Sequence, residues 1–209
     1  MISQENTFEI VPVLEANPLV LDQQIYLASI GDSLMITQCK FYLSQLIFES
    51  IAEEIYTPKK KHHLLDVNQR ESLSISLPTG FEVKNVSFSI GVDSLVNVAG
   101  AQPGDLDPMH GMYWAWNTGY INFKLEGQSP VCERRKNKFQ WHIGGFQAPY
   151  NTQRKVAIKN NPTQNNQLIL DLSKLIASID LKTEHAIMSP NVKAVLLANQ
   201  LTQIFYWNE

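Results

Sequence analysis

The sequence predicts a mainly β protein: a single-domain antiparallel β-sandwich or distorted barrel with a C-terminal amphipathic helix. Three observations lead to this prediction. Apolar and polar residues alternate with a period of two in several segments, as in strands with one buried and one wetter face. Turn residues such as Pro78 and Gly80 end such segments. A clear helical spacing of apolar residues occurs near the C-terminus.

The alternating segments identify the first group of expected strands. Leucine and isoleucine alternate with serine over residues 72–77, and similar patterns occur over residues 86–92, 121–126 and 168–172. Less regular apolar runs predict further strands near residues 8–14, 24–29, 35–49, 62–67, 138–144 and 155–159. Strands of this number with one late helix are typical of a sandwich or a distorted barrel.

A helix is expected before the C-terminus. Ser189 suits its N-cap and Pro190 its first position. The apolar residues that follow at helical spacing are Val192, Val195, Leu196, Leu201, Ile204 and Phe205. A second, short helix is an alternative for residues 172–178.

Composition and charge narrow the class of protein. The chain has 209 residues, of which 44 % are hydrophobic and 18 % charged, so it can bury a large core and is not intrinsically disordered. We expect one domain over residues 1–209, with its core at about 8–206. The net charge of −3 argues against a nucleic-acid partner, and the basic clusters at 59–61 and 134–138 are interpreted as solvated loops. No apolar run is long enough for a transmembrane helix.

The compartment is not decided by the residues alone. The first ten residues lack the apolar region of a signal peptide, which taken literally indicates the cytoplasm, although a chain whose export signal had been removed would look the same. Cys39 lies in an apolar run and Cys132 in a charged loop. One disulfide between them is an open alternative, and no CxxC motif is present.

The segment 97–119 departs from regular alternation. It holds four of the ten glycines, two prolines, one histidine and two tryptophans. Such a long connection in a compact domain is usually functional. Its carboxylates Asp105 and Asp107 are interpreted mainly as turn residues that accept backbone hydrogen bonds. Together with Asp93 they offer an alternative, calcium coordination.

The histidines are the natural candidates for a metal site. His142 lies opposite Trp141 on a predicted strand, His62 and His63 point to opposite faces, His110 lies in the 97–119 segment, and His185 is expected to be exposed. A single strand histidine is usually a hydrogen-bonded structural residue, whereas two that converge would suit copper or zinc. No familiar catalytic motif is present, so we do not expect an enzyme.

The sequence Met-Tyr-Trp-Ala-Trp at 112–116 is the densest group of aromatic residues. If the chain is extended there, Trp114 and Trp116 share a face with Met112. A plug of the core is one interpretation, because large aromatic side chains bury much area. The other is a redox role beside a metal ligand, since tryptophan is easily oxidised.

The pattern Met-aromatic-Trp-x-Trp-x-x-Gly-Tyr at 112–120 is specific, and it lies within longer matches at 91–95, 97–108 and 111–127. With them the chain resembles the MbnP-like copper-binding family, in particular its Bacteroidetes-type branch. Weaker similarity to the same family occurs at 40–44, 63–66 and 141–146. The resemblance extends from about residue 8 to residue 205.

The resemblance implies an exported, β-rich copper-binding protein of the periplasm or outer surface that is not an enzyme. In the family, a di-haem cytochrome c peroxidase-like partner of the MbnH type oxidises a tryptophan to kynurenine. The aryl amine and ketone of kynurenine can complete a copper site with imidazole ligands. By position, the oxidisable pair corresponds to Trp114 and Trp116, and the strand histidine to His142.

The remaining ligands implied by the resemblance are less direct. His63 is the next candidate and His110 follows it, while Met112 and Met109 are soft donors for Cu(I). Two other classes of function remain as alternatives. One is a non-metal module whose aromatic segment stacks on a sugar or peptide, and the other is a calcium-stabilised interaction domain that uses Asp93, Asp105 and Asp107.

Overall fold

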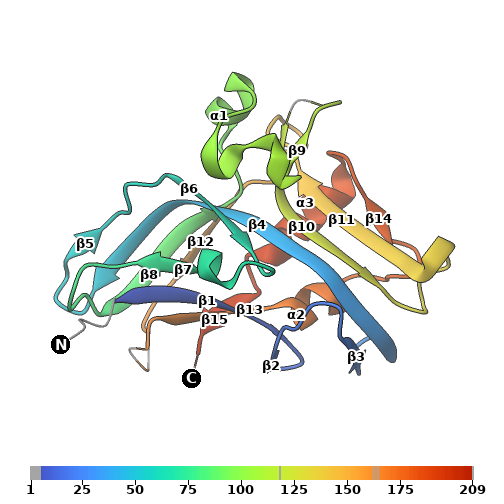
Figure 1. Ribbon diagram of the computed structural model, residues 1–209, viewed down its shortest axis with the longest axis horizontal. Coiled ribbons are helices and arrows are strands. Elements are labelled where there is room, and N and C mark those ends of the chain that lie inside the picture. The colour runs from blue at the N-terminus through green and yellow to red at the C-terminus, as the bar shows by residue number, and fades with distance from the viewer. Residues whose placement is uncertain (1–5, 118, 162, 164, 209) are drawn as a thin grey trace.

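The computed structural model describes residues 6–117, 119–161, 163 and 165–208. Its strands form two sheets, one above the other in the view of Figure 1, with α3 behind the larger sheet's strands. This mainly β architecture, a curled larger sheet with a second sheet and few short helices, confirms the predicted fold class.

The larger sheet carries the candidate site. Its main path runs through six strands: β12 (Arg154–Ile158), β8 (Val83–Ile90), β4 (Asp32–Ser50), β10 (Gly119–Gln128), β11 (Lys138–Gly144) and β14 (Ala186–Ile187). Three short strands also pair with β4: β3 (Gln24–Leu27), β5 (Ile55–Tyr56) and β6 (His62–Asp66). A further short strand, β9 (Tyr113–Trp114), pairs with β10.

The smaller sheet brings the two ends of the chain together. Its order is β15 (Phe205–Trp207), β13 (Gln167–Asp171), β1 (Thr7–Leu14) and β2 (Asn17–Pro18), and β7 (Ser74–Ser76) also pairs with β1. Most of the described strand pairs are antiparallel, as predicted, but β1 with β13 and β11 with β14 are parallel pairs. The alternation of apolar and polar residues indicates which face of a strand is buried, but it does not indicate whether the neighbouring strand runs parallel or antiparallel to it.

The short helix α2 (Leu172–Ala177) forms where the sequence allowed it, and α3 (Val192–Leu201) is the expected C-terminal helix. Its N-cap is Asn191, whose side chain accepts a hydrogen bond from the Ala194 amide, so the predicted cap at Ser189 is wrong by two residues. The helix also ends earlier than predicted, because Phe205 belongs to β15. No helix among the described residues is long and apolar enough to cross a membrane.

The main core lies on one face of the larger sheet. Phe139, Trp141 and Ile143 all point into this core, as their alternation with polar residues predicts.

Cys39 and Cys132 are both buried, free thiols, so the disulfide alternative is wrong. Burial raises the pKa of the Cys39 thiol. Burial also raises the pKa of the Cys132 thiol, although the charge of Arg134 acts in the opposite direction.

Pairing with the long strand β4 determines where the chain leaves the larger sheet between β8 and β10. Phe41 pairs with β6 on one edge and with β10 on the other, whereas Leu43 pairs with β6 and with β8. Strands β8 and β10 therefore follow one another along the same edge of β4. The segment between them, residues 93–117, rises over the outer face of the sheet, and we call it the crown (Figure 1).

Gly91 allows the turn from β8 into the crown. Its φ is +106°, and a Cβ atom at this position would overlap the side chain of Asn122.

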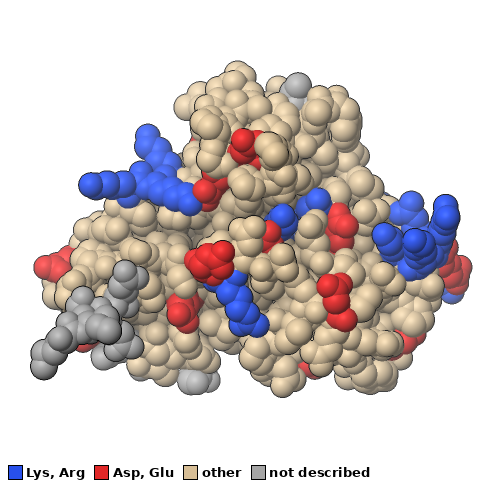
Figure 2. All heavy atoms as spheres, in the orientation of Figure 1, with Lys and Arg blue, Asp and Glu red and all other residues tan. Residues whose placement is uncertain are grey.

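Figure 2 shows that charged side chains are sparse on the visible face of the molecule and that the crown, at the top, is mostly uncharged.

Candidate functional site

The crown is built from short helical turns with ordered caps rather than from one irregular loop. Helix α1 (Ser94–Ala99) is followed by the 3-10 turns η2 (Gly104–Leu106) and η3 (Pro108–His110) and by β9. Asp93 accepts a hydrogen bond from the Val96 amide and so caps α1. Asp107 accepts one from the Met109 amide and caps η3. Gly111 ends η3 in the left-handed conformation.

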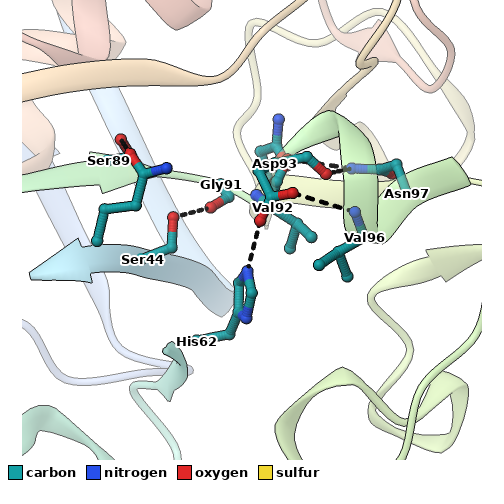
Figure 3. A network of polar contacts seen from close by, with 10 residues as sticks. Ser44, His62, Ser89, Gly91, Val92, Asp93, Val96 and Asn97 are labelled. Carbon is teal, nitrogen blue, oxygen red and sulfur yellow. Dashed lines mark hydrogen bonds and ion pairs between the residues drawn. The ribbon is translucent and has the colours of Figure 1, made fainter. Parts of the chain in front are cut away.

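Polar side chains attach the crown to the sheet at several points, and Figure 3 shows the contacts at the start of α1. His62 Nε2 lies 3.1 Å from Asp93 Oδ2, which links β6 to the start of α1. The buried Asn97 side chain donates to the carbonyl groups of Val92 and Asp93 and accepts from the Tyr120 amide at 2.8 Å. The base of the crown is therefore held by bonds that the fold satisfies internally.

We expect the two functions of Asp93 to be separable by mutation. Asp93→Asn keeps an acceptor for the Val96 amide but removes the carboxylate near His62, whereas Asp93→Ala removes both. The alanine variant should lose ~1 kcal/mol of unfolding free energy from the missing cap. The asparagine variant should lose less, as measured by urea denaturation at pH 7. Equal losses in the two variants would show that the cap itself contributes nothing.

The crown carboxylates support the interpretation as turn residues. Asp105 accepts from the Leu64 amide at 2.7 Å and pairs with Lys60 at 2.6 Å, while Asp93 and Asp107 act as caps. No group of three or more His, Cys, Asp or Glu side chains within the described ranges could hold a metal ion. The carboxylates considered for calcium are thus engaged with the protein itself.

The two tryptophans have different environments. Trp114 is 5 % exposed, and its ring packs closely against Gly144 of β11. A Cβ atom added at Gly144 would lie only 2.7 Å from Cζ3 of this ring. Trp116 is 67 % exposed, and the two ring centroids are 5.8 Å apart. Both rings line a hollow of about 570 Å³ with the loop 145–150 and Pro190. The core-plug interpretation therefore fits Trp114 and does not fit Trp116.

The two methionines also differ. Met112 is fully buried in a small cluster under the crown with Tyr42, Leu106 and Tyr120, apart from the main core. The Tyr42 hydroxyl donates to the Asp105 carbonyl, and the Tyr120 hydroxyl donates to the Leu106 carbonyl. Met109 is 92 % exposed on η3. Only Met112 therefore lies close to the aromatic packing around Trp114.

His142 takes part in a row of ionisable side chains across the sheet under the crown. Register places Asp66, Lys40, Lys124 and His142 directly opposite one another on four neighbouring strands. His142 Nε2 lies 2.6 Å from Glu126 Oε1, and Lys124 Nζ lies 3.6 Å from the same oxygen. Lys40 forms an ion pair with Asp66 at 2.9 Å.

The same two lysines hold the crown from below. Lys40 Nζ donates to the His110 carbonyl at 3.3 Å, and Lys124 Nζ donates to the Gly111 carbonyl at 3.2 Å. These carbonyl groups belong to the two residues that precede Met112. The lysine pair thus fixes the end of η3, from which the Trp-x-Trp segment begins.

The hydrogen bond from His142 lowers the pKa of Glu126 to about 2, although partial burial acts in the opposite direction. A carboxylate with a lowered pKa stabilises the folded state fully above its ordinary value of 4.5, and this contribution is lost as the pH falls towards 2. We therefore expect the stability advantage of the wild type over Glu126→Gln to shrink between these pH values. Urea midpoints measured across this range test the expectation, and an advantage independent of pH would contradict it.

His63 and His110 lie together, away from His142. Both line a pocket of about 190 Å³ with Asp105 and Lys60. His63 Nε2 is 3.0 Å from the Lys60 carbonyl, and His110 Nε2 is 3.0 Å from the Gly104 carbonyl. Burial, followed by the charge of Lys60, lowers the pKa of His63 and favours its neutral form.

The expected ligand residues therefore occupy three places on the outer face of the sheet. Trp114 and Trp116 line the large hollow, His63 and His110 share the small pocket, and His142 pairs with Glu126. His185 is half-buried and bonded to the Lys182 carbonyl outside the crown.

Sequence reasoning missed Glu126, Lys124 and Gly144. Period-two spacing put Glu126 and Lys124 on one face of a strand, but their partners depend on register.

The structure is similar to that of MbnP from Methylosinus trichosporium. The TM-score is 0.66 at 16 % sequence identity, and the match covers 92 % of this chain and 87 % of the other. At this identity the similarity establishes the fold alone. The sequence decides the family, because the family model described as MbnP matches residues 3–192. The chain belongs to the MbnP family. Among curated proteins no significant match was found.

Membership of the MbnP family places the chain among methanobactin-associated copper proteins. Proteins of the MbnP family are generally non-catalytic, and they are generally exported. The matched residues include the crown, both tryptophans and His142.

Proposed function

We propose that this MbnP-family chain is an exported copper-binding protein that holds copper between His142 and the Trp-x-Trp segment. One observation carries the proposal: the buried Trp114 ring packs against Gly144 of β11. Gly144 is two residues from His142, and residues two apart on a strand lie on the same face. The oxidisable Trp114 ring thus packs over the face of β11 that carries the His142 imidazole, under the same crown.

The donor types in this region suit copper. Imidazole nitrogen binds copper well, and the thioether of Met112 is a soft donor for Cu(I). The donors are not gathered into one set in the unmodified chain, since His63 and His110 line a separate pocket. A further donor is therefore needed beside His142, and an oxidised tryptophan is the group that we propose to supply it.

We infer that a di-haem peroxidase-like partner of the MbnH type uses hydrogen peroxide to oxidise one of the two tryptophans to kynurenine. Two equivalents of peroxide cleave the indole C2–C3 bond and add two oxygen atoms, giving N-formylkynurenine and two water molecules. Hydrolysis of the formyl group then releases C2 as formate. Ring opening would create an aryl amine and a ketone, both able to coordinate a metal. The exposure of Trp116 and its 5.8 Å separation from Trp114 support access of an external oxidant to the pair. The 570 Å³ hollow gives the opened ring room to reorient.

Co-expression with a di-haem partner provides the test. The copper content of the purified protein is measured by elemental analysis, and the peptide that contains residues 114–116 is examined by mass spectrometry. We expect near-stoichiometric copper and a mass change in that peptide only after co-expression. Matched Trp114→Phe and Trp116→Phe variants identify the modified residue. No copper in either preparation would exclude the proposed function for this chain.

The exposed Trp116 favours one second candidate, a module that stacks a sugar or peptide in the hollow. Such a ligand would quench Trp116 fluorescence in the protein as purified, without metal or oxidation. Titration with oligosaccharides and peptides, with Trp116→Ala as the control, separates this candidate from copper binding.

A further inference from the structure

We propose that Glu126 is a positioning residue that fixes His142 as the Nε2–H tautomer and so presents Nδ1 as its metal-binding nitrogen. The metal part of this inference rests on the proposed copper function. The tautomer part concerns the metal-free protein and stands on the geometry of the pair.

The hydrogen bond between the two side chains is short and shielded. His142 Nε2 and Glu126 Oε1 are 2.6 Å apart, and the His142 side chain is 9 % exposed. A carboxylate can only accept at neutral pH, so the proton of the bond belongs to Nε2. Among the described residues, no hydrogen bond to Nδ1 of His142 is formed, so this nitrogen keeps its lone pair for another partner.

Glu126 is itself held in place from two sides. Lys124 Nζ lies 3.6 Å from the oxygen that accepts from His142. Gln140, which lies opposite Glu126 on β11, also stabilises the charged carboxylate. Because Lys124 also donates to the Gly111 carbonyl, the support of His142 is connected to the segment that leads to Trp114. The arrangement couples the orientation of the imidazole to the position of the crown.

The carboxylate distinguishes His142 from the other two candidate ligands. His63 and His110 bond their Nε2 atoms to backbone carbonyls, which fix a tautomer but bear no net charge. A carboxylate partner also places a full negative charge beside the imidazole, and such outer partners orient a metal-binding histidine and support its bond to the metal. Loss of such a partner typically lowers metal affinity 10- to 100-fold. Of the three candidates, His142 is thus the best prepared to bind through Nδ1.

The first experiment reads the tautomer without copper. Long-range ¹⁵N–¹H correlation spectra at pH 8 should show His142 with its proton on Nε2 and a slowly exchanging, downfield proton signal. Glu126→Ala should lose the downfield signal, and Glu126→Gln should keep the tautomer, because its amide oxygen still accepts, with a smaller downfield shift. Glu133→Gln serves as the matched control, since Glu133 is an exposed residue paired with Lys182. A wild-type proton on Nδ1, or an Ala variant identical to wild type, would overturn the inference.

The second experiment measures copper affinity after co-expression with the di-haem partner. We expect Glu126→Ala, which removes the acceptor for Nε2–H, to bind copper 10- to 100-fold more weakly than wild type and Glu133→Gln to bind it equally. Unchanged affinity in Glu126→Ala would overturn the metal part. Wild-type protein that shows the Nε2–H tautomer yet binds no copper would contradict the proposed function while supporting Glu126 as the residue that fixes the imidazole.

Discussion

Alanine in place of Gly144 is expected to push the Trp114 ring off the sheet and to lower the free energy of unfolding by ~1–3 kcal/mol. The added Cβ would lie 2.7 Å from the Trp114 ring and 2.7 Å from the Tyr120 carbonyl oxygen. The ring can move outward, but the carbonyl belongs to the neighbouring strand β10 and cannot. The variant should therefore be less stable and should also show a more exposed Trp114.

Urea denaturation and tryptophan emission measure the two effects. Gly119→Ala is the matched control, because a Cβ there would meet the Phe146 ring and Asn97 at ordinary contact distances of 3.4 and 3.5 Å. We expect the control to keep wild-type emission. A Gly144→Ala variant with wild-type stability and emission would show that Trp114 does not pack against β11 as described.

Asn97→Ala should lower the free energy of unfolding by about 2–3 kcal/mol and loosen the crown. The substitution leaves the buried Tyr120 amide without its acceptor and the Val92 carbonyl without its donor. Each buried backbone group left unsatisfied costs ~1–3 kcal/mol. Because Asn97 joins α1 to β10, amide exchange within α1 should accelerate more than exchange within the main core.

The control for this variant is Asn68→Ala, which changes the same residue type at an exposed position outside the crown. Hydrogen exchange measured by mass spectrometry, together with urea midpoints, provides the comparison. A loss of stability no larger than that of Asn68→Ala would mean that the Asn97 side chain does not hold the crown.

The strands were predictable because alternation is a local property. Ile75 and Leu77 are buried and Ser74 and Ser76 are exposed, as the alternation predicts. The predicted strand begins too early, because Leu73 ends a 3-10 helix (Arg70–Leu73) and the strand itself is Ser74–Ser76. The direction of β13 relative to β1 was not predictable, because the two strands are distant in sequence and no turn constrains their pairing. The start of α3 was misplaced because Ser189 and Asn191 are both good caps, and tertiary contacts decide between them.

The candidate site was predictable in its residue types and less so in its arrangement. A functional segment with two tryptophans follows from the unusual density of glycine, proline and aromatic residues at 97–119. Which tryptophan is buried depends on the close approach of Gly144, and the partner of His142 depends on the register between β10 and β11. A shift of one residue in that register would place Glu126 away from His142.

X-ray absorption of the copper-loaded protein tests most directly whether copper is bound by His142 beside an oxidised tryptophan, as we propose. The sample is wild-type protein co-expressed with the di-haem partner, compared with His142→Ala and with His185→Ala as the control. We predict imidazole scattering around copper in the wild type and in His185→Ala, and its reduction, with loss of bound copper, in His142→Ala. An unchanged copper environment and stoichiometry in His142→Ala would contradict the assignment of His142 as a copper ligand.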